Sequence, residues 1–375
     1  MIVSYHEIKP ENISELVRAS SKFGIPRGEN WLRRCLWDPC VCGLVEDSAR
    51  GHMAQLPDGE VVAVECYFYL PCFFKQEKRV CHSACIMGAD PKYSAEFLRV
   101  LHLNSKKVAG VCAEAFNCIS NQKSVDVQRL FYRRREPSYR SDSSGTAAAD
   151  FAMYPLAAVW RLMKCPPTWL EKVVWCLSRP FSWCMRAWRM LLYDHNGYKV
   201  NCYHEIDLAR FGEFWERFLS ANTGLITSRE PRRLEWLFGD SLRAGTITIL
   251  GAEKSDKLDG YVIVRLCLDG HWAKTYEIMD ICAVRNNVKI LRVLVSSAIQ
   301  YVGKLGGIKL VYQGCVPNQE QWLDPYFKRR KRSFPTYLYK TQDPQIQESI
   351  EKGEGWFLGP FDGERCLGHG GLVDV

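Results

Sequence analysis

The sequence predicts an α/β protein made of two similar mixed-sheet domains in tandem. The tetrapeptide Tyr5-His6-Glu7-Ile8 returns later in the chain as Tyr203-His204-Glu205-Ile206. In each copy it is followed by an amphipathic stretch and then by a basic segment rich in tryptophan. These segments are residues 11–23 and 31–38 in the first copy, and residues 208–219 and 232–238 in the second. Because similarity at a fixed period indicates repeated structural units, this shared order favours two copies of one fold.

The first copy alternates predicted strands and helices after its basic segment. Asp58 and Gly59 indicate a tight turn that leads into an apolar strand. The further elements expected are a strand over residues 81–89, a helix over 91–106, a strand over 108–115 and a helix over 122–133. Strands that alternate with helices indicate an α/β sheet with crossover connections.

The second copy repeats this plan more clearly. Asp259 and Gly260 indicate the turn, and residues 275–284 form a strand rich in β-branched and aromatic residues. Asn286 or Asn287 caps a helix whose apolar positions recur at helical spacing, and Gly306-Gly307 ends it. A strand over residues 308–311, a helix over 319–329 and a last strand over 336–340 complete the copy.

The chain therefore divides into four parts. The two domains are residues 1–140 and 200–341, a connector spans residues 141–199, and residues 342–375 form a C-terminal tail. Within the connector, residues 141–147 indicate a flexible joint, because serine, glycine and aspartate favour turns and loops.

Residues 151–193 of the connector mix five tryptophans with lysines and arginines, and prolines divide the segment into short helices. One interpretation is that these helices lie on an anionic membrane surface, where aromatic rings and cations are both favoured. The other is a linker that packs against both domains, since tryptophan and arginine are also enriched at ordinary interfaces.

Composition sets the broad class of the protein. With 375 residues, of which 47% are hydrophobic and 25% charged, the chain has enough apolar residues for two globular cores. The 17 cysteines are scattered without paired CxxC spacing, which favours reduced thiols over a disulfide framework. No leader and no membrane-spanning run is expected, so we predict a cytoplasmic protein. Peripheral contact with the inner face of the membrane through residues 151–193 follows only from the first interpretation of the connector, and the linker interpretation stays open.

The order of elements resembles that of the GCN5-related N-acyltransferases, known as the GNAT superfamily. Residues 89–97 resemble the family's first signature, in which a strand ends and a phosphate-cradling loop opens a long helix, and residues 121–132 resemble its second, an Asn followed by a helix that carries Tyr. In the other copy the corresponding stretches are residues 284–289 and 318–326. The tandem layout is similar to that of the Fem-type aminoacyltransferases.

This resemblance implies an acyl-coenzyme A co-substrate, acetyl-coenzyme A in the first instance, with its pyrophosphate at the start of a long helix. We place that site in the second domain, whose strand–helix–strand core is the better formed. The predicted donor-binding residues are Val284, Arg285, Asn286, Asn287, Val288, Lys289 and Asn318. The second loop contains no glycine, and in the first copy Ala95 and Phe97 stand where the family has glycine, but Lys92 and Arg99 lie nearby as an alternative anion site.

The predicted catalytic residues also lie in the second copy. Acyl transfer to an amine requires a group that removes a proton and an acid that protonates the leaving thiolate. Glu277 and Asp280 are the carboxylates on the central strand, although simple alternation points them to opposite faces. The resemblance gives Tyr326 the role of the acid, with Tyr132 as its counterpart in the first copy.

The predicted function is transfer of an acyl group from acyl-coenzyme A to an amine acceptor, with a sugar or a cell-envelope precursor as the candidate acceptor. The alternatives are a Fem-type transferase that uses aminoacyl-tRNA, and a non-catalytic binding or scaffold protein with the same fold. No metal is expected, because the side chains of Cys81, His82 and Cys85 alternate in direction along a predicted strand and so do not converge on one ion. The two cysteines are interpreted as buried thiols. Basic runs at residues 133–135 and 328–332 favour an anionic partner, but nothing favours nucleic acid.

Overall fold

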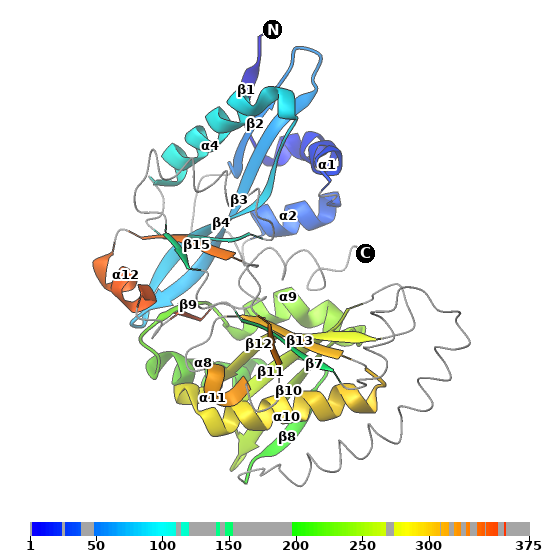
Figure 1. Cartoon of the computed structure of the whole chain (residues 1–375), viewed down its shortest axis with the longest axis vertical. Helices are drawn as coiled ribbons and strands as arrows, with labels where there is room; N and C mark the ends of the chain where they lie inside the picture. The colour runs from blue at the N-terminus through cyan, green and yellow to red at the C-terminus, as the bar shows by residue number, and fades with distance from the viewer. Residues whose placement is uncertain are drawn as a thin grey trace, which may run out of the picture.

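The computed structural model describes residues 2–24, 27–38, 49–109, 114–119, 140–142, 147–152, 197–267, 274–307, 309–314, 319–323, 328–330, 336–341, 343–351 and 356–357. These residues form two mixed sheets, each flanked by helices, in two bodies that lie one above the other in Figure 1. The fold is therefore the predicted α/β pair of mixed-sheet domains.

The first sheet has the order β1-β2-β3-β4-β5-β15-β6. Its strands from the first half are β1 (Ser4–Glu7), β2 (Gly51–Gln55), β3 (Val61–Phe74), β4 (Glu77–Ala89), β5 (Glu114–Ile119) and β6 (Arg140–Asp142). Its helices are α1 (Ile13–Lys22), α2 (Glu29–Trp37) and α4 (Ser94–Ala109), and short 3₁₀ turns at Pro10–Asn12 and Pro91–Tyr93 lead into α1 and α4. Helix α4 packs chiefly over β2 and β3.

The second sheet has the order β14-β7-β13-β12-β11-β10-β8. Its strands are β7 (Ala147–Ala152), β8 (Lys199–Tyr203), β10 (Ile247–Lys254), β11 (Lys257–Cys267), β12 (Thr275–Ala283), β13 (Lys309–Gly314) and β14 (Lys328–Arg330). Its helices are α8 (Leu208–Ser220), α9 (Pro231–Arg243), α10 (Val288–Lys304) and the short α11 (Gln319–Leu323), with a 3₁₀ turn at Val284–Asn286.

Local sequence explains where the long helices start and stop. The Asp207 carboxylate accepts hydrogen bonds from two backbone N–H groups at the start of α8. The Asn287 side-chain oxygen accepts one, from the Lys289 backbone N–H, and so caps α10 as predicted. At the other end of α10, Gly306 takes a φ of 74°, the left-handed conformation that glycine adopts without steric cost.

The two halves repeat each other at the level of strand register. Strand β4 carries an extra residue at Cys85 relative to β3, and β12 carries one at Met279 relative to β11. These bulges precede the starts of α4 and α10 by equal spacings. In β2 and β10 the register likewise shifts directly after Ala54 and Ala252. The repeat is therefore carried by geometry, down to the positions of the bulges.

Two of the sequence landmarks are wrong in detail. Tyr5 pairs with Ala54 but Tyr203 pairs with Ile249, so the repeated tetrapeptide does not occupy equivalent positions. The second turn lies at Ser255 and Asp256, both with positive φ, whereas Asp259 and Gly260 lie within β11. A two-residue turn with positive φ at both positions matches the twist of a hairpin, and the turn therefore lies four residues before the Asp-Gly pair.

Each half completes the sheet of the other. The predicted strand at residues 336–340 exists as β15 (Thr336–Lys340), but it pairs with β5 and β6 in the first sheet. Conversely, β7 of the connector pairs with β13 and β14 in the second sheet. Figure 1 shows this exchange, with the orange β15 in the upper body and the green β7 in the lower one. The first body thus depends on residues near the end of the chain.

Several boundaries differ from the prediction. Residues 140–142 and 147–152 are strands, so the proposed joint at residues 141–147 is not loop throughout. Helix α4 continues to Ala109, which moves the following strand to β5, and α11 ends at Leu323 with strand β14 after it. Alternating or mixed patterns of this length do not separate a short helix from a strand. The predicted helix over residues 122–133 and most of the segment 151–193 lie outside the described residues.

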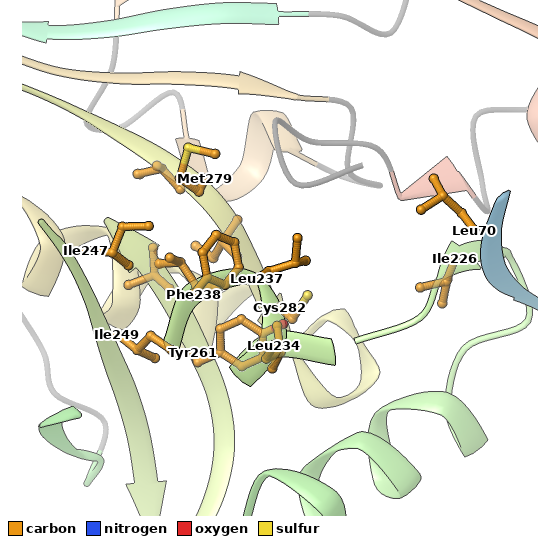
Figure 2. Close-up of a cluster of buried hydrophobic side chains, with 14 of the residues drawn as sticks. Leu70, Ile226, Leu234, Leu237, Phe238, Ile247, Ile249, Tyr261, Met279 and Cys282 are labelled. Carbon is orange, nitrogen blue, oxygen red and sulfur yellow. The ribbon is translucent and has the colours of Figure 1, made fainter. Parts of the chain in front are cut away.

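A continuous apolar core joins the two bodies. Strand β9 (Leu225–Thr227) pairs with the far end of β3 and with β16 (Trp356–Phe357), near helix α12 (Pro344–Glu351). Figure 2 shows Leu70 of β3 beside Ile226 of β9, and both belong to the same buried cluster as Tyr261. At the surface of this junction, the Arg34 guanidinium donates to the Trp236 carbonyl oxygen. Among the described residues, no helix is long and apolar enough to cross a membrane.

Candidate functional site

Each sheet contains a pair of parallel strands that separate. Among the described residues, strands β4 and β5 pair at Cys81 with Glu114 and at His82 with Ala115, after which β4 continues to Ala89. Strands β12 and β13 pair as far as Ile278 with Tyr312, and β12 continues to Ala283.

The bulges at Cys85 and Met279 lie just past these last parallel pairs. Backbone N–H and C=O groups along the separated segments have left the parallel ladder, so an extended polar ligand between the strands would find hydrogen-bonding groups there. Both copies therefore offer the same opening.

A helix N-terminus follows each opening, and unpaired N–H groups there favour an anion. In the first copy, Asp90 accepts a hydrogen bond from the Lys92 backbone N–H, and the Lys92 side chain is exposed. The Arg99 guanidinium lies over the Tyr5 ring, 4.5 Å from its centroid. The two cations noted in the sequence thus lie in the first half of the helical segment that follows β4.

In the second copy, residues of the predicted donor loop are held by contacts with other parts of the chain. Arg285 and Asn286 both have positive φ, at 57° and 49°, which glycine adopts at lower cost than other residues. The Asn286 amide donates to the Asn222 side-chain oxygen at 2.8 Å, and Asn287 caps α10. Arg285 and Lys289 are exposed, whereas Val284 and Val288 are half-buried against the core.

The two openings differ in access to solvent. In the first copy Met87, Gly88 and Ala89 at the end of β4 are half-buried. In the second copy Met279, Ile281 and Ala283 are at most 1% exposed. An acyl donor needs a route to the strand edge, so the described residues favour the opening in the first domain.

Glu277 and Asp280 lie on the same face of the second sheet, and the prediction of opposite faces is wrong. Glu277 pairs with Arg265 and Asp280 pairs with Ile263, two residues apart on β11. The extra residue Met279 shifts the alternation by one position. A bulge cannot be recognised from the local sequence pattern, so alternation alone gave the wrong face.

Asp280 is fully engaged by its neighbours. Its two carboxylate oxygens accept hydrogen bonds from Nε and Nη2 of Arg229, each at 3.1 Å, and Oδ2 also accepts one from the Tyr261 hydroxyl at 2.8 Å. Arg229 is 2% exposed and donates further to the Thr227 backbone and side-chain oxygens. Burial, followed by the charge of Asp280, raises the pKa of Tyr261 well above its ordinary value.

Glu277 is buried too, at 4% exposure. The Arg265 guanidinium donates to its Oε2 at 2.5 Å, and both side chains are nearly inaccessible. A carboxylate that neutralises a buried arginine cannot accept a proton without leaving that cation uncompensated. The geometry therefore favours structural roles for both Glu277 and Asp280.

The remaining predicted residues are placed as follows. Asn318 and Tyr326 lie outside the described residues. Cys81 and Cys85 are buried free thiols, as predicted, and they lie beside Cys72 and Cys66 respectively. Over the described ranges, no three metal-ligating side chains gather into a possible metal site.

One polar cluster escaped the sequence interpretation. Asn104 of α4 donates to the Glu65 side chain at 2.7 Å and accepts from His52 at 2.5 Å, and all three residues are buried. The sequence feature that could have indicated this cluster is the carboxylate of Glu65 within the apolar run of β3, where it follows four uncharged residues.

No protein-family model and no curated protein matches the sequence. Several solved structures do match the fold. A GCN5-related N-acetyltransferase from Anabaena variabilis ATCC 29413 is 10% identical over 90% of this chain and 72% of its own, with a TM-score of 0.54. One from Kribbella flavida is 14% identical over 92% and 72%, with a TM-score of 0.53. The chain has the fold of the GCN5-related N-acetyltransferases.

The likeness in fold extends to an N-myristoyltransferase. Saccharomyces cerevisiae N-myristoyltransferase, solved with bound myristoyl-CoA and inhibitors, is 8% identical over 90% of this chain and 79% of its own, with a TM-score of 0.52. The match spans both sheets, and so the tandem GNAT-like architecture predicted from the sequence is confirmed. The similarity to Fem-type aminoacyltransferases stays a prediction.

Proposed function

We propose that the protein transfers an acyl group from an acyl-coenzyme A to an amine. The observation that carries this proposal is the separation of β4 from β5 beyond His82, directly followed by the exposed start of the helical segment at Pro91. An extended thioester arm would lie along the separated strand, and its pyrophosphate would meet the helix N-terminus. The fold is shared with acetyl- and myristoyltransferases, which supports acyl transfer to an amine as the general chemistry.

The donor site that we propose lies in the first domain, although the sequence favoured the second. The end of β4 is accessible and the end of β12 is covered, and Asn286 of the second loop is tied to Asn222. Lys92 and Arg99 would supply positive charge to the phosphates. Residues 284–289 and Asn318 are the alternative site.

The chemical step that we propose requires a neutral amine and an acid for the departing thiolate. Glu277 and Asp280 hold buried arginines, so we look for the proton acceptor elsewhere, in a water chain or at the first opening. Tyr326 remains the candidate acid from the family resemblance. A small amine on a sugar or cell-envelope precursor is the proposed acceptor, and acetyl-coenzyme A is the first donor to test.

Charge variants distinguish the two donor sites. Replacing Lys92 and Arg99 together by alanine should weaken acyl-coenzyme A binding about tenfold or more, because each lost charged contact contributes on the order of 1 kcal/mol at a partly exposed site. The effect should be largest at low salt, where exposed charges are least screened. Calorimetric titration measures it.

The matched control replaces Arg285 and Lys289, which are the exposed cations at the start of the equivalent helical segment in the second copy. Unchanged affinity in this control, together with the loss in the first variant, supports the first domain. The reverse pattern moves the donor to the second domain. Binding of aminoacyl-tRNA without binding of acyl-coenzyme A would favour the Fem-type alternative. Binding of neither donor would favour the scaffold alternative.

The connector is the second part of the proposal. We propose that residues 151–193 contact anionic lipid, because they interleave tryptophans with cations. Flotation with liposomes should depend on the fraction of anionic lipid. Equal flotation with neutral liposomes, or none with either kind, would favour the linker interpretation.

A further inference from the structure

The cluster of His52, Asn104 and Glu65 lies between α4 and the face of the first sheet. His52 and Glu65 are directly opposite each other on β2 and β3, so their side chains share that face. Asn104 reaches down from α4 and bridges them, donating to Oε2 of Glu65 at 2.7 Å and to its backbone oxygen at 3.0 Å. The three residues are 9%, 3% and 6% exposed, respectively, for His52, Asn104 and Glu65.

The second domain has apolar residues at the three positions that correspond to this cluster. Register and helix position make Leu250, Val262 and Ala298 the counterparts of the cluster: Leu250 pairs with Val262 as His52 pairs with Glu65. Val262 pairs with Ile281 and Glu65 with Met87, at equal spacings after the bulges. All three counterparts are buried and apolar.

Burying polar and ionisable groups costs free energy that apolar residues of the same site do not cost. The second domain therefore serves as an internal reference: the fold packs α10 with leucine, valine and alanine, so stability alone does not explain His52, Glu65 and Asn104.

The hydrogen bonds also define where a proton is held. Oδ1 of Asn104 can only accept, so Nδ1 of His52 is the donor in the 2.5 Å contact. Nδ2 of Asn104 donates to Glu65, so the amide is oriented in one direction by both partners. Nothing in these contacts requires a positive imidazole or a negative carboxylate.

We propose that His52, Asn104 and Glu65 form a proton-holding site beneath α4, in which Glu65 is a neutral acid and His52 a neutral base, so that seating of the helix on the sheet is linked to proton transfer from His52 to Glu65. Burial raises the pKa of Glu65 to about 7, with the Asn104 hydrogen bond opposing the shift. Burial likewise lowers the pKa of His52 below 6.5, against the effect of its bond to Asn104.

The other charges near the cluster have their own partners. Arg50, two positions before His52, is buried, lies with its guanidinium 5.2 Å from the Tyr69 ring centroid and donates to the Leu36 and Ala49 carbonyl oxygens. Glu7 on β1, directly opposite His52, forms an ion pair with Lys107 of α4, and Lys9 lies 3.5 Å from Glu7. On β4, Met87 is opposite Glu65, and the nearest titratable side chain further along that face is His82, beside the Tyr67 ring. The Glu7–Lys107 pair is neutral as a unit, so it supplies no net counter-charge to an ionised Glu65.

The pH dependence follows from the two shifts. An acid whose folded pKa is raised stabilises the seated state below its unfolded value of 4.5, and that contribution is lost as pH rises to about 7. A base whose folded pKa is lowered destabilises the seated state as pH falls below 6.5. In the intact cluster the two effects oppose each other between about pH 5 and 6.5, and the seating of α4 stays nearly independent of pH there.

Single substitutions should reveal the separate contributions of Glu65 and His52 to the pH dependence. In His52→Gln, the opening equilibrium of α4, measured by amide hydrogen exchange corrected for the intrinsic rate, should rise about tenfold per pH unit from about pH 5 to 7. In Glu65→Gln, which keeps the shape and hydrogen bonds of the neutral acid, opening should instead rise as pH falls below about 6.5. Between about pH 5 and 6.5 the wild type should show neither slope.

Infrared difference spectra locate the proton directly. At about pH 6, the wild type minus Glu65→Gln should show the carbonyl stretch of one buried protonated carboxyl group. Absence of that band, with a large loss of α4 protection in Glu65→Gln, would mean an imidazolium–carboxylate pair and would overturn the proposal. The control is the triple variant His52→Leu, Glu65→Val, Asn104→Ala, which carries the residues of the second domain and should retain α4 without either pH slope.

A consequence for donor binding rests on the proposed function. Because α4 follows β4 through the loop at Pro91–Tyr93, acyl-coenzyme A binding should acquire the pH slope of each single variant. If the exchange and infrared results hold and acyl-coenzyme A does not bind, the proton site stands and the proposed function fails. If acyl-coenzyme A binds and the band is absent, the function stands and the proton site fails.

Discussion

Replacing Asp280 by alanine will lower the free energy of unfolding by about 3–5 kcal/mol, because it leaves the Arg229 guanidinium buried without a counter-charge. Both partners are nearly inaccessible, at 4% and 2% exposure. The Tyr261 hydroxyl loses its acceptor in the same variant. Denaturant unfolding followed by tryptophan fluorescence measures the loss.

The controls separate this effect from general sensitivity. Removing Glu29 from its exposed pair with Arg33 should cost less than about 1 kcal/mol. Replacing both Asp280 and Arg229 by leucine should recover part of the loss, because no buried charge then remains unpaired. A loss below about 1 kcal/mol in Asp280→Ala, with reduced turnover, would restore Asp280 as a catalytic candidate.

The position of Arg229 gives this pair a wider role. Its loop follows β9, and the neighbouring Ser228 backbone N–H donates to the Pro71 carbonyl oxygen of β3 at 2.8 Å. Arg233 reaches the same oxygen at 3.4 Å. The pair therefore fastens the centre of the second sheet to the segment that joins the two bodies, and its loss should loosen their contact.

Proline at Leu338 should unfold the first body, although the residue lies near the end of the chain. Leu338 is in β15, which has a neighbouring strand on each side, pairing with Asn117 on one and Ser141 on the other. Proline removes a backbone donor and does not fit a central strand, at a cost of about 3 kcal/mol or more. Hydrogen exchange should rise in β5 before it rises in β13.

Proline at Ser4, the first residue of edge strand β1, is the matched control and should have little effect. If β15 instead belonged to the second body, as the sequence suggested, Leu338→Pro would first remove protection from β13. The exchange of β7 and β15 also predicts that residues 1–140 alone lack a strand of their sheet.

Much of the fold was predictable because its helices and strands are determined by local sequence patterns. Helix α10 has a cap at Asn287, apolar positions at helical spacing and a terminal glycine at position 306, and each of these acts within a few residues. Strand β12 was predicted from the β-branched and aromatic residues at positions 275–284. The two-domain order followed from the same signals appearing twice.

The errors came from long-range pairing. Nothing near residues 336–340 indicates which sheet receives the strand, because a strand pattern records burial and not the identity of its neighbours. The bulge at Met279 changed the face of Glu277, and the ion pair between Arg229 and Asp280 joins positions far apart in the sequence. Site residues that depend on such geometry were therefore predicted less well than helices and strands.

The most direct test of the account is calorimetric titration of the intact protein with acetyl-coenzyme A and with longer acyl-coenzyme A thioesters. The proposed function predicts binding that is weakened by Lys92→Ala with Arg99→Ala and unaffected by Arg285→Ala with Lys289→Ala. Absence of binding with every thioester, in a protein whose unfolding transition shows it to be folded, would contradict it.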